Sequence, residues 1–257
     1  MEEQIQFKND RGETLAGTLH RPEQGDAARG VVLGHCFTCT RHTGILRRVA
    51  GELVQRGFMA LRFDFSGNGQ SQGDFADSTY SKQVSEMQSA MNLLAERGAR
   101  WIALGGHSMG ALIAFLTAVE VGDVPAVCTL AGRLAGMGAS SFLNPEQRRR
   151  LRENGEVSFR SRGRELTVTD RFFEDARRFD PTRALREFRR PLLIVHGSED
   201  EIIPVQEATR AHEIGGDNVT LEIIPDADHM FGRGEDAEKV ARLVARWYET
   251  QAGHRTS

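Results

Sequence analysis

The fold of this chain is decided by the stretch Trp101-Ile102-Ala103-Leu104-Gly105-Gly106-His107-Ser108-Met109-Gly110-Ala111-Leu112-Ile113-Ala114. It combines a short apolar strand, a G-x-S-x-G turn and an apolar helix. In such a turn the serine lies at a tight corner that exposes its hydroxyl. Gly106 and Gly110 are needed because a side chain at either position would collide with the adjoining strand or helix. The competing interpretation is a glycine-rich turn in which Ser108 is idle.

Strands and helices alternate along most of the remaining chain. Besides the elements around Ser108, we expect strands at residues 5–8, 14–20, 31–33, 60–65, 124–130, 191–195 and 219–224, and helices at residues 45–55, 81–96, 206–213 and 235–248. The first two strands should pair antiparallel. The alternation predicts an α/β fold whose mostly parallel sheet is covered by helices on both faces. Active sites of such sheets lie beyond the carboxyl ends of the strands.

One segment breaks this alternation, and we interpret it as an insertion in a single domain that spans residues 1–257. The insertion covers about 133–190, with a helix at 145–152, a hairpin of strands 156–160 and 164–168, and a helix at 170–178. Because it begins at the same end of the sheet as the serine, a lid or binding element is favoured. A structural appendage that covers a sheet edge is the alternative.

Composition excludes several classes of protein. Hydrophobic residues make up 39% and charged residues 27% of the chain, and the net charge is -3, which argues against disorder, nucleic acid and anionic membranes. No apolar run approaches the ~20 residues of a membrane helix. The acidic start is unlike a secretory signal. The three cysteines, Cys36, Cys39 and Cys128, suit a reducing cytoplasm better than a disulfide framework.

A serine nucleophile needs a base to accept its proton and a third group to orient that base. His229 lies in the loop between the last strand and the last helix, at the expected catalytic end of the sheet. The acid should lie between Ser108 and His229 in the sequence. We choose Asp200 over Glu199 and Glu201 because a short carboxylate on a tight turn is held more rigidly. Asp200 would fix the tautomer of His229 and stabilise the imidazolium.

Two backbone N–H groups should stabilise the oxyanion that forms in the transition state. One belongs to Met109, directly after the serine, and the other to Phe37, in the loop after an early strand. The Phe37 ring is a candidate substrate contact, and so is His107, although the His107 side chain must point away from the serine to keep the turn. His35 and His196 end core strands and could lie near the site.

These motifs resemble those of the α/β-hydrolase family and, more narrowly, those of the cinnamoyl/feruloyl-esterase-like serine hydrolases. The similarity spans nearly the whole chain and rests on G-H-C-F-T at 34–38, F-D-F-S-G-N-G-Q-S-Q-G-D-F at 63–75, G-H-S-M-G at 106–110, H-G-S-E-D at 196–200 and A-D-H-M-F at 227–231. The resemblance implies an inserted subdomain that forms the acid and alcohol pocket, and residues 133–190 occupy its position.

Three further features of the sequence allow more than one interpretation. Cys36 stands where most relatives have glycine, and with Cys39 it forms C-x-x-C, which resembles hydrolase domains fused to OsmC-type peroxide-reducing domains. We expect two buried thiols there, with a redox role as the alternative. The glycines at 67, 69 and 73 lack the dinucleotide-binding spacing and indicate a turn-rich loop. The arginines of the insertion indicate a solvated, ion-paired face more than an anion site.

We therefore expect a cytoplasmic serine hydrolase that acts on carboxylic esters, with small aryl or short acyl esters, hydroxycinnamates among them, as substrates. No metal or organic cofactor is expected. The expected partner is a small-molecule ester. We expect neither nucleic acid nor a membrane as a partner, and a homodimer is left open. The alternatives are a thioesterase or acyltransferase with the same triad, a peptidase of the same fold, and a non-catalytic binding module.

Overall fold

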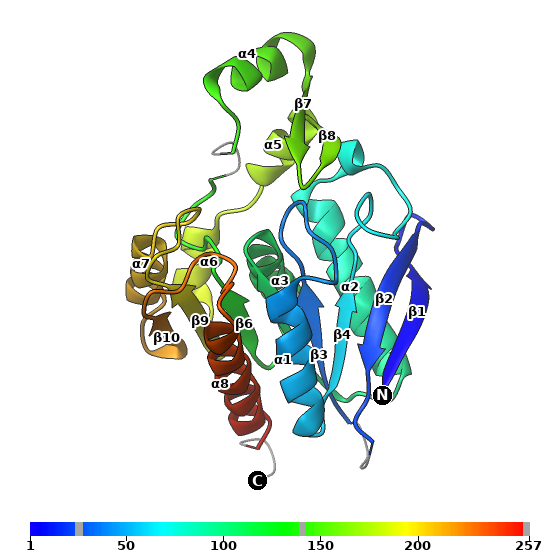
Figure 1. The fold of residues 1–257 in the computed structure, drawn as a ribbon, viewed down its shortest axis with the longest axis vertical. Helices are drawn as coiled ribbons and strands as arrows, with labels where there is room; N and C mark the ends of the chain where they lie inside the picture. Colours follow the sequence, from blue (N-terminus) through cyan, green and yellow to red (C-terminus); the bar gives the residue numbers. More distant parts are fainter. Residues whose placement is uncertain (24–27, 139–141, 254–257) are drawn as a thin grey trace.

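A computed structural model describes residues 1–23, 28–138 and 142–253, and its centre is an eight-stranded sheet (Figure 1). The strand order is β1-β2-β4-β3-β5-β6-β9-β10. The strands are β1 Glu2–Lys8, β2 Thr14–His20, β3 Arg29–Gly34, β4 Met59–Phe63, β5 Trp101–His107, β6 Val127–Leu130, β9 Leu192–Gly197 and β10 Val219–Ile224. β2 pairs antiparallel with β1 and β4, and the other neighbours are parallel. The mostly parallel α/β architecture is thus confirmed.

Helices cover both faces of the sheet, and each face has its own core. α1 (Gly44–Gln55) and α8 (Gly234–Gly253) pack on one face, while α2 (Tyr80–Glu96) and α3 (Met109–Val121) pack on the other (Figure 1). Successive side chains of a strand point to opposite faces. In β3, Val32 therefore joins the core under α2 and α3, and its neighbours join the other core.

Two strands are shorter than the sequence suggests, and hydrogen bonding explains one of them. β4 ends at Phe63 because the backbone N–H of Phe65 donates to Nε2 of His35, at 3.0 Å, instead of to a neighbouring strand. β6 begins at Val127, although the buried residues 124 and 126 precede it. Apolar residues that are buried just before a strand make the strand look longer in the sequence than it is in the structure.

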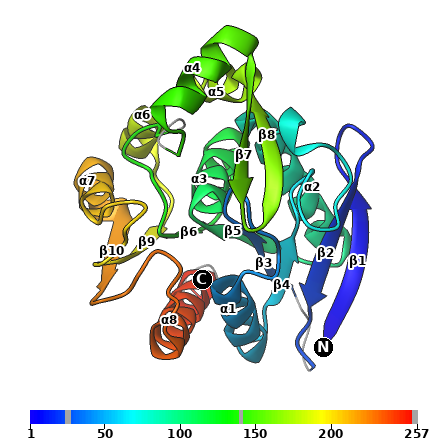
Figure 2. The same ribbon diagram turned by 45° about the horizontal axis from the view of Figure 1, so that its top comes forward.

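The insertion leaves the sheet after β6 and returns to it at β9. It contains α4 (Pro145–Asn154), the hairpin of β7 (Glu156–Ser161) and β8 (Arg164–Thr169), and α5 (Asp170–Ala176), close to their expected positions. A further helix, α6 (Pro181–Glu187), was not expected. Figures 1 and 2 show α4, β7 and β8 standing above the end of the sheet that β3 and β5 reach with their carboxyl ends.

One short helix completes the main body. α7 (Gln206–Gly215) follows β9 and buries Ala208 and Ala211 against the same core as α2 and α3. Among residues 1–23, 28–138 and 142–253, we find no helix with the length and apolar character that a bilayer crossing requires.

Candidate active site

Ser108 occupies the sharp corner between β5 and α3. Its backbone has φ 56° and ψ -117°, a conformation that is strained for a residue with a side chain. The corner leaves no room for larger neighbours: a Cβ on Gly106 would lie 2.3 Å from the Gly110 carbonyl oxygen, and one on Gly110 would lie 2.3 Å from that of Gly34. The Ser108 N–H donates to Leu130 O at 2.8 Å and fixes the corner to β6. The sequence predicts this turn correctly.

Asp200 and His229, 29 residues apart, meet at the carboxyl end of the sheet. Nδ1 of His229 lies 2.8 Å from Oδ2 of Asp200, and both side chains are nearly inaccessible. The other oxygen, Oδ1, accepts the backbone N–H groups of Ile202 and Ile203 at 2.9 and 2.7 Å. A carboxylate with both oxygens engaged can only hold the imidazole in one orientation, with Nδ1 protonated and Nε2 directed elsewhere.

The same carboxylate is held by a second histidine that sequence reasoning placed only near the site. His196, in β9, has Nε2 3.0 Å from Oδ2 of Asp200 and 2.8 Å from Ile203 O, so Nε2 carries the proton. Burial alone would raise the pKa of Asp200. Hydrogen bonds from His196, His229 and the Ile203 N–H outweigh burial and hold the pKa well below its usual range. Asp200 therefore stays ionised.

The structure does not bring His107 into contact with a substrate space, which corrects that expectation. His107 is fully buried, and its Nε2 lies 2.8 Å from the backbone carbonyl of His229. The carbonyl can only accept, so Nε2 donates. Burial, followed by the nearby His229, lowers the pKa of His107 to about 4 and keeps its ring neutral. The residue before the serine thus supports the loop that carries His229.

The loop after β3 carries the second expected oxyanion donor. No acceptor in the described part of the chain takes the N–H of Phe37 or of Met109. His35, the other histidine expected near the site, anchors the loop from inside: its Nε2 accepts the Phe65 N–H at 3.0 Å, so its Nδ1 donates to Cys36 O at 2.7 Å. Two backbone N–H groups are thus available at this end of the sheet.

Ser108 opens onto a cavity of about 170 Å³ between the sheet and the insertion. Phe37, whose ring was expected to contact the substrate, lines it, and so does Met109. The other lining residues were not singled out from the sequence, and they are Tyr80, Leu112, Arg133, Gly138, Phe142, Phe172, Ile202 and Ile203. Four of the cavity's side chains are aromatic, and the rings of Phe142 and Phe172 both lie 5.1 Å from that of Phe37.

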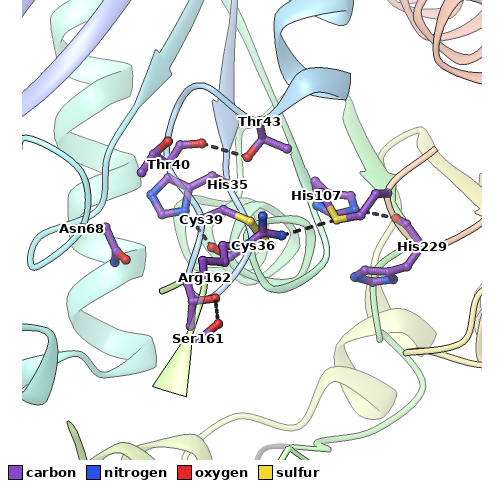
Figure 3. The surroundings of a disulfide bond; sticks show 12 residues. His35, Cys36, Cys39, Thr40, Thr43, Asn68, His107, Ser161, Arg162 and His229 are labelled. Atoms are coloured by element: carbon purple, nitrogen blue, oxygen red, sulfur yellow. Dashed lines mark hydrogen bonds between the residues drawn. A yellow bond between two sulfur atoms is a disulfide. The ribbon is translucent and has the colours of Figure 1, made fainter. Parts of the chain in front are cut away.

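The two cysteines of the C-x-x-C motif are joined by a disulfide, which corrects the expectation of two free buried thiols (Figure 3). Cys36 and Cys39 are 8% and 4% exposed, so the expected burial holds. The spacing of three allows the two sulfurs to meet across one tight turn, with Cα atoms 5.1 Å apart. The expectation of a reducing compartment rested on an odd and sparse set of cysteines, two of which the structure pairs. Cys128 is free and buried in β6.

Within residues 1–23, 28–138 and 142–253, no three His, Cys, Asp or Glu side chains gather in a way that could hold a metal ion. The arginines of the insertion are partly paired, as expected: Arg149 and Arg150 each face a glutamate four residues away on α4, at 3.9 and 2.6 Å.

Comparison with known families assigns the class of protein. Residues 23–243 match the alpha/beta hydrolase family, and the chain belongs to this family. The fold and the corner serine agree with that assignment. Among curated proteins, a 74-residue stretch is 30% identical to a non-reducing polyketide synthase, ausA, of Penicillium brasilianum, and this match spans 3% of that protein's length.

Solved structures with the same fold include esterases. The esterase domain of a Rhodothermus marinus protein is 24% identical, with 97% of this chain and 98% of that chain covered and a TM-score of 0.75. Est1E of Butyrivibrio proteoclasticus with bound ferulic acid is 23% identical, with 97% and 99% covered and a TM-score of 0.83. At this identity the likeness establishes the fold, and the chemistry must be argued from the site.

Proposed function

We propose that this chain is a serine hydrolase of carboxylic esters, with Ser108 as nucleophile, His229 as base and Asp200 as the group that orients the base. The observation that carries the proposal is the 2.8 Å contact between His229 and the ionised Asp200, at the same end of the sheet as the serine that opens onto the cavity. An idle serine would need neither this paired histidine nor a strained corner.

The proposed reaction has two halves. Ser108 Oγ attacks the ester carbonyl carbon while Nε2 of His229 takes its proton, and Asp200 stabilises the resulting imidazolium. The imidazolium then protonates the leaving alcohol, and an acyl-enzyme remains. Water, deprotonated by His229, attacks the acyl-enzyme, and the imidazolium returns that proton to Ser108 as the acid leaves. The N–H groups of Phe37 and Met109 are the proposed donors to the oxyanion in both halves.

The cavity supports an aryl or other compact apolar acyl group as substrate. Phe37, Tyr80, Phe142 and Phe172 give it largely aromatic walls, and about 170 Å³ is a small volume. Hydroxycinnamate esters fit this description, and the likeness to Est1E with ferulic acid supports the same choice. We further propose that residues 133–190 act as a lid, because Arg133, Phe142 and Phe172 of the insertion line the cavity onto which Ser108 opens.

The test is hydrolysis of a panel of aryl and alkyl esters by the purified chain and by Ser108→Ala. We expect kcat/KM to fall by roughly three orders of magnitude or more in the variant. Equal rates in both proteins would refute the proposal and favour a non-catalytic binding module. Thioesters of the same acyl groups belong in the panel, since faster cleavage of these would instead favour a thioesterase.

A further inference from the structure

The Cys36–Cys39 disulfide closes a four-residue loop that contains Phe37, the proposed oxyanion donor. In the view of Figure 3 it lies between His35 and Asn68 on one side and His107 and His229 on the other. The bond thus constrains only one backbone turn inside the site. It does not tie distant parts of the chain together, so it is poorly suited to stabilise the fold as a whole.

On its inner side, this loop is attached to the core through one carbonyl. Cys36 O accepts from Nδ1 of His35 at 2.7 Å and from the Cys39 N–H at 3.0 Å. The second of these is the only backbone hydrogen bond, among the described residues, that closes the turn around Phe37 and Thr38. The disulfide reinforces that one bond covalently.

On its outer side, the loop meets the hairpin of the insertion. Thr38 Oγ1 and Ser161 Oγ lie 2.8 Å apart, and Nη2 of Arg164 donates to Thr38 O at 3.0 Å and to Asn68 Oδ1 at 3.1 Å. The turn that carries the Phe37 N–H is therefore also the surface on which β7 and β8 rest. A change in the turn would reach both the backbone donor and the hairpin.

The Phe37 ring packs against aromatic side chains that lie outside this turn. It lies 5.0 to 5.1 Å, between ring centroids, from Phe75, Phe142 and Phe172. If the turn relaxes, the ring can keep its place in the cavity wall while the backbone N–H rotates away from the oxyanion. Substrate binding and transition-state stabilisation at this residue are therefore separable.

We propose that the Cys36–Cys39 disulfide is a positioning element for the Phe37 N–H, and that its reduction by a dithiol lowers turnover without closing the cavity. This inference rests on the proposed function. In the reduction, the dithiol gives up two electrons and two protons and becomes a disulfide itself, and the protons go to the two cysteine sulfurs. Both residues are mostly buried, so the exchange should be slow.

The first experiment establishes the bond in the purified, air-oxidised protein. Alkylation with iodoacetamide in denaturant without reductant should modify one thiol, Cys128, and alkylation after dithiothreitol should modify all three cysteines. Modification of three thiols in the oxidised sample would overturn the inference.

The second experiment compares the wild type with the double variant Cys36→Ala, Cys39→Ala, and with Cys128→Ala as the matched control. We expect kcat for an aryl ester to fall about tenfold in the double variant, since loss of a whole oxyanion donor costs roughly 10²–10³. KM should stay within about twofold because the Phe37 ring remains in place. The control should behave as the wild type. Wild-type kcat in the double variant would overturn the inference.

A third readout separates positioning from general loosening. An aryl boronic acid, which forms a tetrahedral adduct with a serine, should bind the double variant about tenfold more weakly, while the product acid should bind equally well. Equal weakening of both ligands would point to a collapsed cavity and contradict the inference. Dithiothreitol should reproduce the loss in the wild type, reversibly on reoxidation, and should not affect the double variant.

The outcomes distinguish this inference from the proposed function. If the wild type shows no ester hydrolysis that depends on Ser108, the proposed function fails. If it does, and the cysteine variants keep full turnover, only the role of the disulfide fails. If the double variant is poorly folded by thermal unfolding, the reversible effect of dithiothreitol on the folded wild type decides instead.

Discussion

The candidate site has a base side, formed by Asp200, His229, His107 and His196, and an acyl side, formed by Phe37, Tyr80, Phe142 and Phe172. On the base side, hydrogen bonds hold the polar groups. His229 and His196 lie 2.8 and 3.0 Å from Asp200 Oδ2, and His107 lies 2.8 Å from the His229 carbonyl. On the acyl side, aromatic rings pack against one another, and the insertion supplies two of them. Substitutions on the base side should therefore lower the rate of the chemical step, and substitutions on the acyl side should change the preference among substrates.

The largest effect should come from Asp200→Asn. The amide keeps the size of the side chain, but it removes the charge that stabilises the imidazolium and can present a donor to Nδ1, which favours the wrong tautomer of His229. We expect kcat to fall by roughly 10⁴ with little change in KM. Steady-state kinetics on an aryl ester test this. Glu199→Gln, one residue earlier and exposed, is the matched control and should keep wild-type rates.

The base side should also make stability depend on pH through His107. Its pKa is lowered from 6.5 to about 4, so between these values the unfolded chain binds a proton that the folded chain does not. The contribution of neutral His107 to the free energy of unfolding is fully present above about pH 6.5. It is lost as the pH drops toward about 4, by up to roughly 3 kcal/mol. His20, whose pKa is also lowered to about 4 by burial, adds to the same trend.

Urea unfolding at pH 7 and pH 5 measures this dependence. His107→Gln, which can still donate to the His229 carbonyl but does not titrate, should lose less stability between the two pH values than the wild type. An unchanged pH dependence in the variant would mean that His107 is not held neutral in the folded protein.

On the acyl side, Phe172→Leu should change selectivity more than rate. The shorter side chain removes an aromatic contact from the cavity wall while Ser108 and the base stay in place. We expect the ratio of kcat/KM for a cinnamate ester over an acetate ester to change about tenfold, a typical effect of altered apolar contacts in a pocket. Phe173→Leu is the matched control, because Phe173 does not line the cavity. A ratio that changes equally in both variants would contradict this assignment.

The smallest effect should come from the hairpin of the insertion. Arg164→Met removes the hydrogen bonds to Thr38 O and Asn68 Oδ1 but keeps much of the side-chain volume. We expect kcat/KM to fall two- to threefold, since a surface contact of this kind contributes about 1 kcal/mol or less. Arg160→Met, on the same hairpin, changes a side chain that forms no hydrogen bond or ion pair with any described residue, and it should have no effect. A larger loss in Arg160→Met would show that the hairpin does not act through Arg164.

The two sides also differ in how well the sequence predicts them. Ser108, Asp200 and His229 each follow a core strand within a short motif, so strand order alone brings them to one edge of the sheet. Part of the cavity wall comes from α2 and the insertion, and no local pattern states that Tyr80 and Phe172 will lie with their rings 5.0 Å apart. Such contacts depend on how the insertion folds back onto the sheet.

The predictions that the structure corrects also have physical explanations. His107 was expected as a substrate contact, but it ends β5 with its ring fully buried, and that ring supports the His229 loop instead. The C-x-x-C spacing permits either thiols or a disulfide, and only the tight turn at Cys36 and Cys39 decides between them. α6 was missed because its seven residues carry too short a periodic pattern.

The proposed function requires that Ser108 is a nucleophile activated by His229. The most direct measurement is labelling of the purified chain with a fluorophosphonate, followed by peptide mapping, in the wild type and in His229→Ala. We expect one modified residue, Ser108, and labelling of the variant slower by two or more orders of magnitude. Labelling at another residue, or at the same rate in the variant, would contradict it.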